Sequence, residues 1–359
     1  MLYHGSYWTG KWAETTKDIF FAAGYFGVSL FFVISGFIMV ITTKKSDGSL
    51  SYVKSFITKR FTRIWPAYFI ATLISFLLLE GVSWFTSGEH LTYFIRSMLF
   101  IPSGTAPAPT FGTPVLPVGW TLTYEMIFYV LFAISMLAGK MRWLFFYSFA
   151  MLMLVALPFI LKGGFSFSPT FDYGLNSISL GLITSPIIWM FVAGVVIGQL
   201  YMSKIKIGSE TFCWMMVFFA CSLVISQYVA GARIGHGLLE WGISVIPLML
   251  CLTIASKTIH IKIPRVVVYL GDISFSLYLM HVLMQGLTLH ALINMGLGDF
   301  AQGMANIITT TATSIIAAGL FYRYVESFFS NRLLKIISKK ADATAGAMKS
   351  MPHAESPRV

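Results

Sequence analysis

Charged side chains are scarce in this sequence, and acidic side chains are the scarcest. Asp, Glu, Lys and Arg make up 11% of the 359 residues, and only 14 residues are acidic. Hydrophobic residues reach 57%, and the mean hydropathy is +0.77. A soluble globular domain has roughly 25% charged residues and does not need so much apolar surface. This composition excludes an ordinary soluble domain and indicates a chain that is largely solvated by lipid.

Cysteine is rare as well. Cys213, Cys221 and Cys251 all lie inside apolar stretches, so the sequence shows neither a disulfide framework nor the paired spacing of a zinc site. The sequence therefore gives no reason to expect a metal or a permanently bound cofactor.

Internal repeats are another feature that we do not find in the sequence. Repeats of this kind mark inverted-repeat transporters.

What the sequence does contain is a series of long apolar blocks. Within lipid, backbone N–H and C=O groups must pair inside the protein, and apolar runs of about 20 residues do so as helices. We therefore predict an all-α polytopic membrane protein with about nine transmembrane helices. The predicted spans are Ile19–Ile41, Ile64–Leu79, Trp120–Leu137, Trp143–Leu161, Leu180–Tyr201, Phe212–Val229, Leu238–Ala255, Val266–Leu292 and Ala305–Val325. The segment Tyr93–Ile101 is too short to span and is predicted to be re-entrant or interfacial.

Lys and Arg are distributed unevenly between the predicted loops. When the loop Thr43–Arg63 is placed in the cytoplasm, most of the 25 basic residues fall on the cytoplasmic side, as the positive-inside rule requires. Membrane topology thus explains the net charge of +11, and no nucleic-acid partner is expected. We expect residues 1–340 to form one membrane domain and residues 341–359 to form a disordered tail in the cytoplasm.

This topology has a consequence for the N-terminus. With nine spans and a cytoplasmic C-terminus, the segment Met1–Asp18 must lie outside the cytoplasm. Either the first helix inserts with its short N-terminus translocated, or a further helix precedes Met1. We expect the second arrangement, in which the sequence as given is truncated at its N-terminus.

Ionisable side chains inside membrane spans are costly, so each one is a candidate functional residue. Glu125 lies near the outer end of its predicted span, and Thr121 and Tyr129 share its helical face at i,i+4 spacing. Glu125 could have a purely structural role as a protonated glutamate that bridges two helices by hydrogen bonds. A neutral Gln would do this at lower cost, and we therefore favour a functional role for Glu125.

A second polar face occurs in the predicted span Val266–Leu292. Ser274, Tyr278 and His281 follow the i, i+4, i+7 spacing of one helical face. A histidine beside hydroxyl groups can act as a general base or a proton relay. The same residue types also hold membrane helices together, so both interpretations stay open.

A basic cluster lies at the cytoplasmic end of the predicted span Ile64–Leu79. It comprises Lys59, Arg60 and Arg63, and the two arginines are three residues apart on one face. Paired guanidinium groups bind phosphates well. A positive-inside membrane anchor explains the same residues without any ligand.

Five stretches of the chain, taken together, resemble the acyltransferase-3 family of integral membrane acyltransferases, especially the bacterial exopolysaccharide and O-antigen O-acetyltransferases. They are GYFGVSLFFVISGFIM, KRFTRIWPAYF, PVGWTLTYEMIFY, GDISFSLYLMH and FYRYVES. Each stretch alone is weakly specific, but five in the family's order and spacing are specific. The resemblance covers nearly the whole chain.

The resemblance implies ten membrane helices with both termini in the cytoplasm, in a bacterial inner membrane. It also implies a first helix that carries an Arg upstream of a catalytic His. His4 stands at the position of that His, whereas the Arg and the first helix have no counterpart here. Ser29 stands where relatives often have Asp. On this resemblance, His4 is the expected catalytic base or transient acyl acceptor.

The resemblance further implies an acyl donor, an acyl-CoA and most simply acetyl-CoA, whose phosphates would meet Lys59, Arg60 and Arg63. The acceptor would be a hydroxyl of a cell-surface or exported polysaccharide, or of a lipid-linked glycan. Glu125 would act on the acceptor side, with His281 and Tyr278 lining the path between them. Because Glu125 maps toward the outer half and the arginines map inside, the acyl group is expected to enter the membrane. A polytopic glycan or lipid transporter and an inactive truncated relative are the alternatives.

Overall fold

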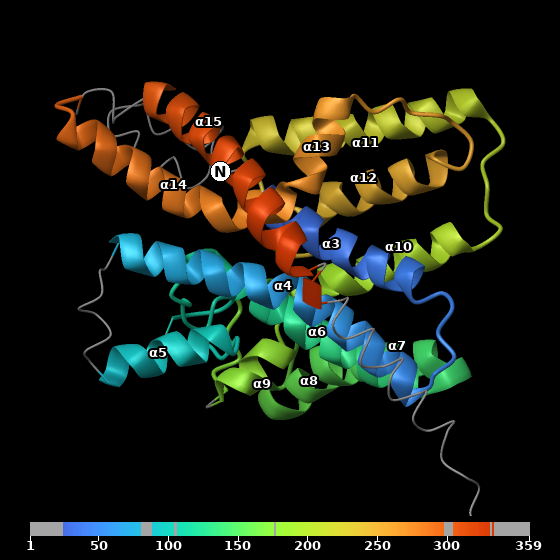
Figure 1. The fold of residues 1–359 in the computed structure, drawn as a ribbon. Coiled ribbons are helices and arrows are strands. Elements are labelled where there is room, and N and C mark those ends of the chain that lie inside the picture. The colour runs from blue at the N-terminus through green and yellow to red at the C-terminus, as the bar shows by residue number, and fades with distance from the viewer. Residues whose placement is uncertain are drawn as a thin grey trace, which may run out of the picture.

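The computed structural model describes residues 24–79, 88–103, 106–175, 177–297, 304–330 and 332–333. These ranges contain helices and loops and no β-strand (Figure 1). Eight of the helices in them are long and apolar enough to cross a membrane, and the shorter helix Gly242–Ala255 is apolar too. The prediction of an all-α polytopic membrane protein is confirmed. His4 and the tail 341–359 lie outside the described residues.

The helices follow the predicted spans closely in most of the chain. In chain order they are α3 (Gly24–Thr42), α4 (Leu50–Leu79), α5 (Gly88–Met98), α6 (Trp120–Leu137), α7 (Arg142–Met151), α8 (Leu157–Lys162), α9 (Ile178–Ile183), α10 (Ile188–Met202), α11 (Glu210–Ala230), α12 (Gly242–Ala255), α13 (Arg265–Asp272), α14 (Ser274–Asn294) and α15 (Met304–Phe321). One π-helical turn, Leu152–Ala156, joins α7 to α8, and another, Tyr322–Glu326, continues α15.

Helix α4 begins much earlier than the predicted start at Ile64. Ser49 precedes its first residue, Leu50, and the Ser49 hydroxyl accepts a hydrogen bond from the backbone N–H of Tyr52 at 3.1 Å, as a helix cap does. Hydropathy reports partitioning into lipid and not helix formation, so the polar first turns were missed. A helix of 30 residues is about 45 Å long and exceeds the hydrocarbon core of about 30 Å. The basic cluster therefore lies inside a helix and not in a loop.

The predicted span Val266–Leu292 is divided into two helices. The short helix α13 ends at Asp272, and α14 begins at Ser274. Ile273 between them has φ −86° and ψ 2°, outside the α-helical region. Gly271 and Asp272 are weak helix formers, which explains a break at this point. Ser274 thereby stands at the first position of α14.

The centre of the molecule depends on close backbone packing between α3 and α10 (Figure 1). A Cβ atom at Gly36 would lie 2.1 Å from the carbonyl oxygen of Phe191, and one at Gly194 would lie 2.1 Å from that of Val33. Only glycine allows two helices to approach this closely. Helix α6 packs against this centre and α4 packs against α6, while α14 pairs with α15 and α11 with α12.

Candidate active site

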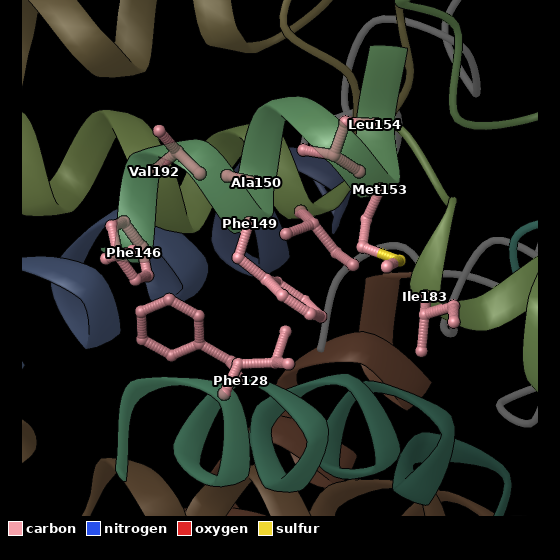
Figure 2. A pocket seen from close by; sticks show the side chains of 10 residues that line it. Phe128, Phe146, Phe149, Ala150, Met153, Leu154, Ile183 and Val192 are labelled. Carbon is pink, nitrogen blue, oxygen red and sulfur yellow. The ribbon is translucent and has the colours of Figure 1, made fainter. Parts of the chain in front are cut away.

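Two cavities in the described part of the chain differ sharply in size and lining. Figure 2 shows the smaller one, which lies between α6, α7 and α10 and is lined only by apolar side chains, among them Phe128, Phe146 and Ile183. Its volume of about 20 Å³ holds no more than about one water molecule. With no polar side chain in its wall, this pocket cannot carry acid–base chemistry.

The second cavity has a volume of about 1100 Å³ and is lined by α3, α4, α6, α14 and the loop 231–241. Five of the predicted site residues line it: Arg60, Arg63, Glu125, Tyr278 and His281. The structure thus brings together residues from three helices that are far apart in sequence. Lys59 is exposed and does not line this cavity.

Glu125 is buried and accepts two hydrogen bonds through Oε1. The donors are the hydroxyl of Tyr129, one turn along α6, and the Oγ atom of Ser35 on α3, which lies 3.3 Å away. Tyr129 was recognised in the sequence as a residue on the same face. Ser35 was not, because nothing in the sequence places α3 beside α6.

Arg60 lies close to the same group. Its guanidinium donates to the Oγ1 atom of Thr42 at 2.9 Å and stands 5.6 Å from the ring centre of Tyr129, at a distance typical of cation–π contacts. Because the Tyr129 hydroxyl donates a hydrogen bond to Glu125, only the Tyr129 side chain lies between the arginine and the carboxyl group. The sequence predicts them in opposite halves of the membrane, and the structure places both on the wall of one cavity.

Arg63 interacts electrostatically with two buried carboxyl groups, those of Glu125 and Glu326. Glu326 lies in the π-helical turn after α15, and its Oε2 atom accepts a hydrogen bond from Ser276 Oγ at 2.5 Å. Sequence reasoning missed Glu326. The rule that singled out Glu125, an acidic residue bordering an apolar span, would have found it in FYRYVES.

Tyr278 uses its hydroxyl group to hold the start of α6. Its Oη atom donates to the carbonyl oxygen of Val118 at 2.6 Å and lies 2.6 Å from Thr121 Oγ1. The ring stacks on Phe31 at an interplanar angle of 9°. This hydroxyl is therefore engaged in fixing the turn that precedes Glu125.

His281 is oriented by its own helix. Its Nδ1 atom lies 2.8 Å from the carbonyl oxygen of Tyr278 and 3.2 Å from that of Leu277. A carbonyl oxygen can only accept a hydrogen bond, so Nδ1 carries a ring proton. His281 can thus act as a base from the wall of the cavity.

The far end of the cavity holds a second histidine, His236, in the loop 231–241. Its ring centre lies 4.7 Å from that of Tyr25 and 5.1 Å from that of Trp120. Burial lowers the pKa of His236 to about 4, so the imidazole is neutral near pH 7. Burial also raises the pKa of the neighbouring Glu240. Sequence reasoning had no signal for His236, since a histidine in a polar loop is uninformative by itself. It missed Glu240, although this residue lies inside the predicted span Leu238–Ala255.

Comparison with known proteins identifies the family of this chain. A family model described as "Acyltransferase domain" matches residues 1–323. The chain is 30% identical over 334 residues to exopolysaccharide production protein ExoZ of Rhizobium meliloti (strain 1021), covering 88% of this chain and 92% of that protein. It is 25% identical over 279 residues to putative acetyltransferase ORF330 of Acidianus two-tailed virus, covering 74% of this chain and 75% of that protein. No solved structure matches the chain significantly.

Proposed function

This chain belongs to the acyltransferase family, and we propose that it moves an acetyl group from acetyl-CoA to a hydroxyl group of an exported polysaccharide. The observation that carries the proposal is the single cavity of about 1100 Å³ that contains Arg60, Arg63, Glu125 and His281. One cavity thus contains two arginines that can bind the donor, together with a carboxyl group and an imidazole that can act in the transfer. The substrate class is supported by the likeness to a protein of exopolysaccharide production.

The donor would enter the cavity beside the N-terminal half of α4, which carries Arg60 and Arg63. Acetyl-CoA carries several phosphate charges, and two guanidinium groups on one cavity wall are suited to bind them. Arg60 is held in place by Thr42 and by the ring of Tyr129. This pre-organisation reduces the entropy cost of binding.

The transfer step requires a base, because a sugar hydroxyl is a weak nucleophile at neutral pH. The hydroxyl oxygen attacks the thioester carbon, its proton passes to an imidazole, and the CoA thiolate leaves and takes up that proton. His281 lines the described cavity, and we assign this proton transfer to its imidazole. His4, which the family resemblance nominates, stays a prediction because it lies outside the described residues. Glu125 would hold or orient the hydroxyl through its carboxyl oxygens.

We place the protein in a bacterial inner membrane with its C-terminus in the cytoplasm. The excess of Lys and Arg in alternate loops supports this orientation. The donor then reaches the arginines from the cytoplasm, and the acceptor reaches the opposite end of the cavity from outside.

The test uses purified protein in lipid nanodiscs, acetyl-CoA labelled in the acetyl group, and polysaccharide that lacks acetyl groups. We expect label on the polysaccharide with the wild-type protein and at least a 100-fold lower rate with His281→Ala, as for loss of a general base. Glu125→Gln should lower the rate by about 100-fold, as for a misplaced acceptor hydroxyl. Glu210→Gln, a change at an exposed residue of α11, serves as the control and should retain the wild-type rate. Label that stays on CoA in nanodiscs, together with polysaccharide that crosses the bilayer of sealed proteoliposomes, would instead identify a transporter.

A further inference from the structure

The outer end of the large cavity contains polar groups that donor binding and proton transfer do not use. They lie on the loop 231–241, which connects α11 to α12, and on segments that face this loop. The residues are Tyr25, Thr110, Thr113, Trp120, Thr170, His236 and Glu240. No Lys or Arg contributes to this end, because the basic residues that line the described cavity are Arg60 and Arg63. An anionic ligand is therefore not expected here.

His236 presents one ring nitrogen to the cavity. Its Nδ1 atom is buried and has no hydrogen-bond partner among the described residues. The ring is held between Tyr25 and Trp120, and the residue lines the cavity. The backbone of Tyr25 also forms a hydrogen bond with this ring, so the imidazole has at most one nitrogen left for a ligand. A neutral imidazole can exchange one hydrogen bond with a hydroxyl group without the desolvation cost of a charge.

The loop that carries His236 is fixed from both sides. The Oε2 atom of Glu240 accepts the backbone N–H of Gly237 at 2.9 Å. Gln227 Nε2 donates to the backbone oxygen of Glu240 at 3.0 Å. At Gly237 an added Cβ would lie 2.6 Å from Pro169 Cδ, so this loop packs tightly against the segment that contains Thr170. A pre-formed wall of this kind costs little entropy when a ligand binds.

An aromatic side chain, several hydroxyl groups and a neutral imidazole together match the chemistry of a sugar ring, which has apolar C–H faces and a rim of hydroxyls. Small-molecule sites have the same composition, aromatic walls with a few placed polar groups. We propose that the outer end of the cavity binds one sugar ring of the acceptor, with the ring against Trp120 and a sugar hydroxyl hydrogen-bonded to His236. This inference rests on the proposed function and names the side chains that hold the acceptor.

The test separates binding of the acceptor from binding of the donor. His236→Ala should raise the KM for the polysaccharide about tenfold, as for a lost ligand hydrogen bond of about 1.4 kcal/mol, and leave the KM for acetyl-CoA unchanged. His236→Asn keeps a polar amide and should recover part of this loss. His260→Ala, at an exposed histidine outside the cavity, should behave as wild type. An unchanged polysaccharide KM in folded His236→Ala protein, or an equal rise for both substrates, overturns the proposal.

A second measurement makes the two proposals separable. Binding of an acceptor oligosaccharide to the purified protein is measured by calorimetry without any acetyl donor. If the wild-type protein does not use acetyl-CoA but binds the oligosaccharide, and His236→Ala weakens this binding about tenfold, the donor assignment fails and the sugar site stands. If the oligosaccharide binds wild type and His236→Ala equally, or binds neither, the sugar site is wrong.

Discussion

The hydroxyl of Tyr278 donates a 2.6 Å hydrogen bond to the backbone carbonyl of Val118, and so ties α14 to the turn from which α6 begins. The sequence predicts Tyr278 as one of the catalytic residues, lining the path toward Glu125. Its hydroxyl is hydrogen-bonded to the protein backbone and lies beside Thr121. We interpret Tyr278 as a positioning residue that sets the start of α6 and therefore the depth of Glu125.

Tyr278→Phe removes this hydrogen bond and keeps the stacking on Phe31. We expect kcat to fall by about five- to twentyfold and the protein to lose about 1 kcal/mol of stability. Acetyl transfer rates and thermal unfolding of the purified variant give the two numbers. A loss of activity as large as that of Glu125→Gln would show that the hydroxyl takes part in the chemistry.

Glu326 holds the second carboxyl group that interacts with Arg63. Glu326→Gln keeps an acceptor for Ser276 and replaces the carboxyl group that interacts with Arg63 by a neutral amide. We therefore expect the KM for acetyl-CoA to rise about three- to tenfold with a smaller change in kcat. The exposed Glu210→Gln is the matched control. If Glu326→Gln lowers kcat alone, Glu326 acts on the reaction and not on the donor.

The glycine contacts between α3 and α10 give a prediction about folding. A methyl group at Gly194 would lie 2.1 Å from the backbone oxygen of Val33, so Gly194→Ala must push the two helices apart. We expect a loss of about 2 kcal/mol, measured as the free energy of unfolding in detergent. Gly27→Ala in α3 is the control, since no described atom lies within 4 Å of an added Cβ there. Equal stabilities of the two variants would contradict the close helix packing.

The buried imidazole of His236 makes stability depend on pH. The unfolded chain takes up a proton at this side chain below about pH 6.5, whereas the folded protein does so only near pH 4. The unfolded state therefore binds more protons between these values, and stability falls as pH decreases from 6.5 to 4, by at most about 3 kcal/mol. Above pH 6.5 this contribution is constant.

His236→Gln removes that titration while the nearby Glu240 stays in both proteins. The midpoint of thermal unfolding should drop more steeply for the wild type than for His236→Gln between pH 6.5 and 4.5. Parallel curves over this range would show that His236 does not resist protonation in the folded state.

Hydropathy was sufficient to predict the helical class and most spans, because partitioning into lipid decides which segments cross the membrane. It did not locate the start of α4 at Leu50, since the turns that carry Lys59 and Arg60 are polar and still helical. It also missed the break at Ile273, where weak helix formers divide an apolar stretch.

The candidate site was predicted in part for a similar reason. Glu125 and His281 were recognised because a polar side chain within an apolar helix is conspicuous. Ser35 and His236 could not be recognised, because their roles arise from contacts between distant segments. The proximity of Arg60 to Glu125 depends on the continuous length of α4, which no local pattern in the sequence reveals.

The central claim is that the cavity-lining arginines bind the donor. It is tested most directly by the KM for acetyl-CoA of Arg60→Ala and of its sequence neighbour, Lys59→Ala. Arg60 lines the cavity, while Lys59 is exposed outside it. We expect the KM for acetyl-CoA to rise at least about tenfold in Arg60→Ala, because a charge-assisted contact is lost. In Lys59→Ala we expect this KM to rise less than about twofold, as for an exposed charge. Equal effects of the two substitutions would mean that positive charge near the membrane surface, and not the cavity, attracts the donor.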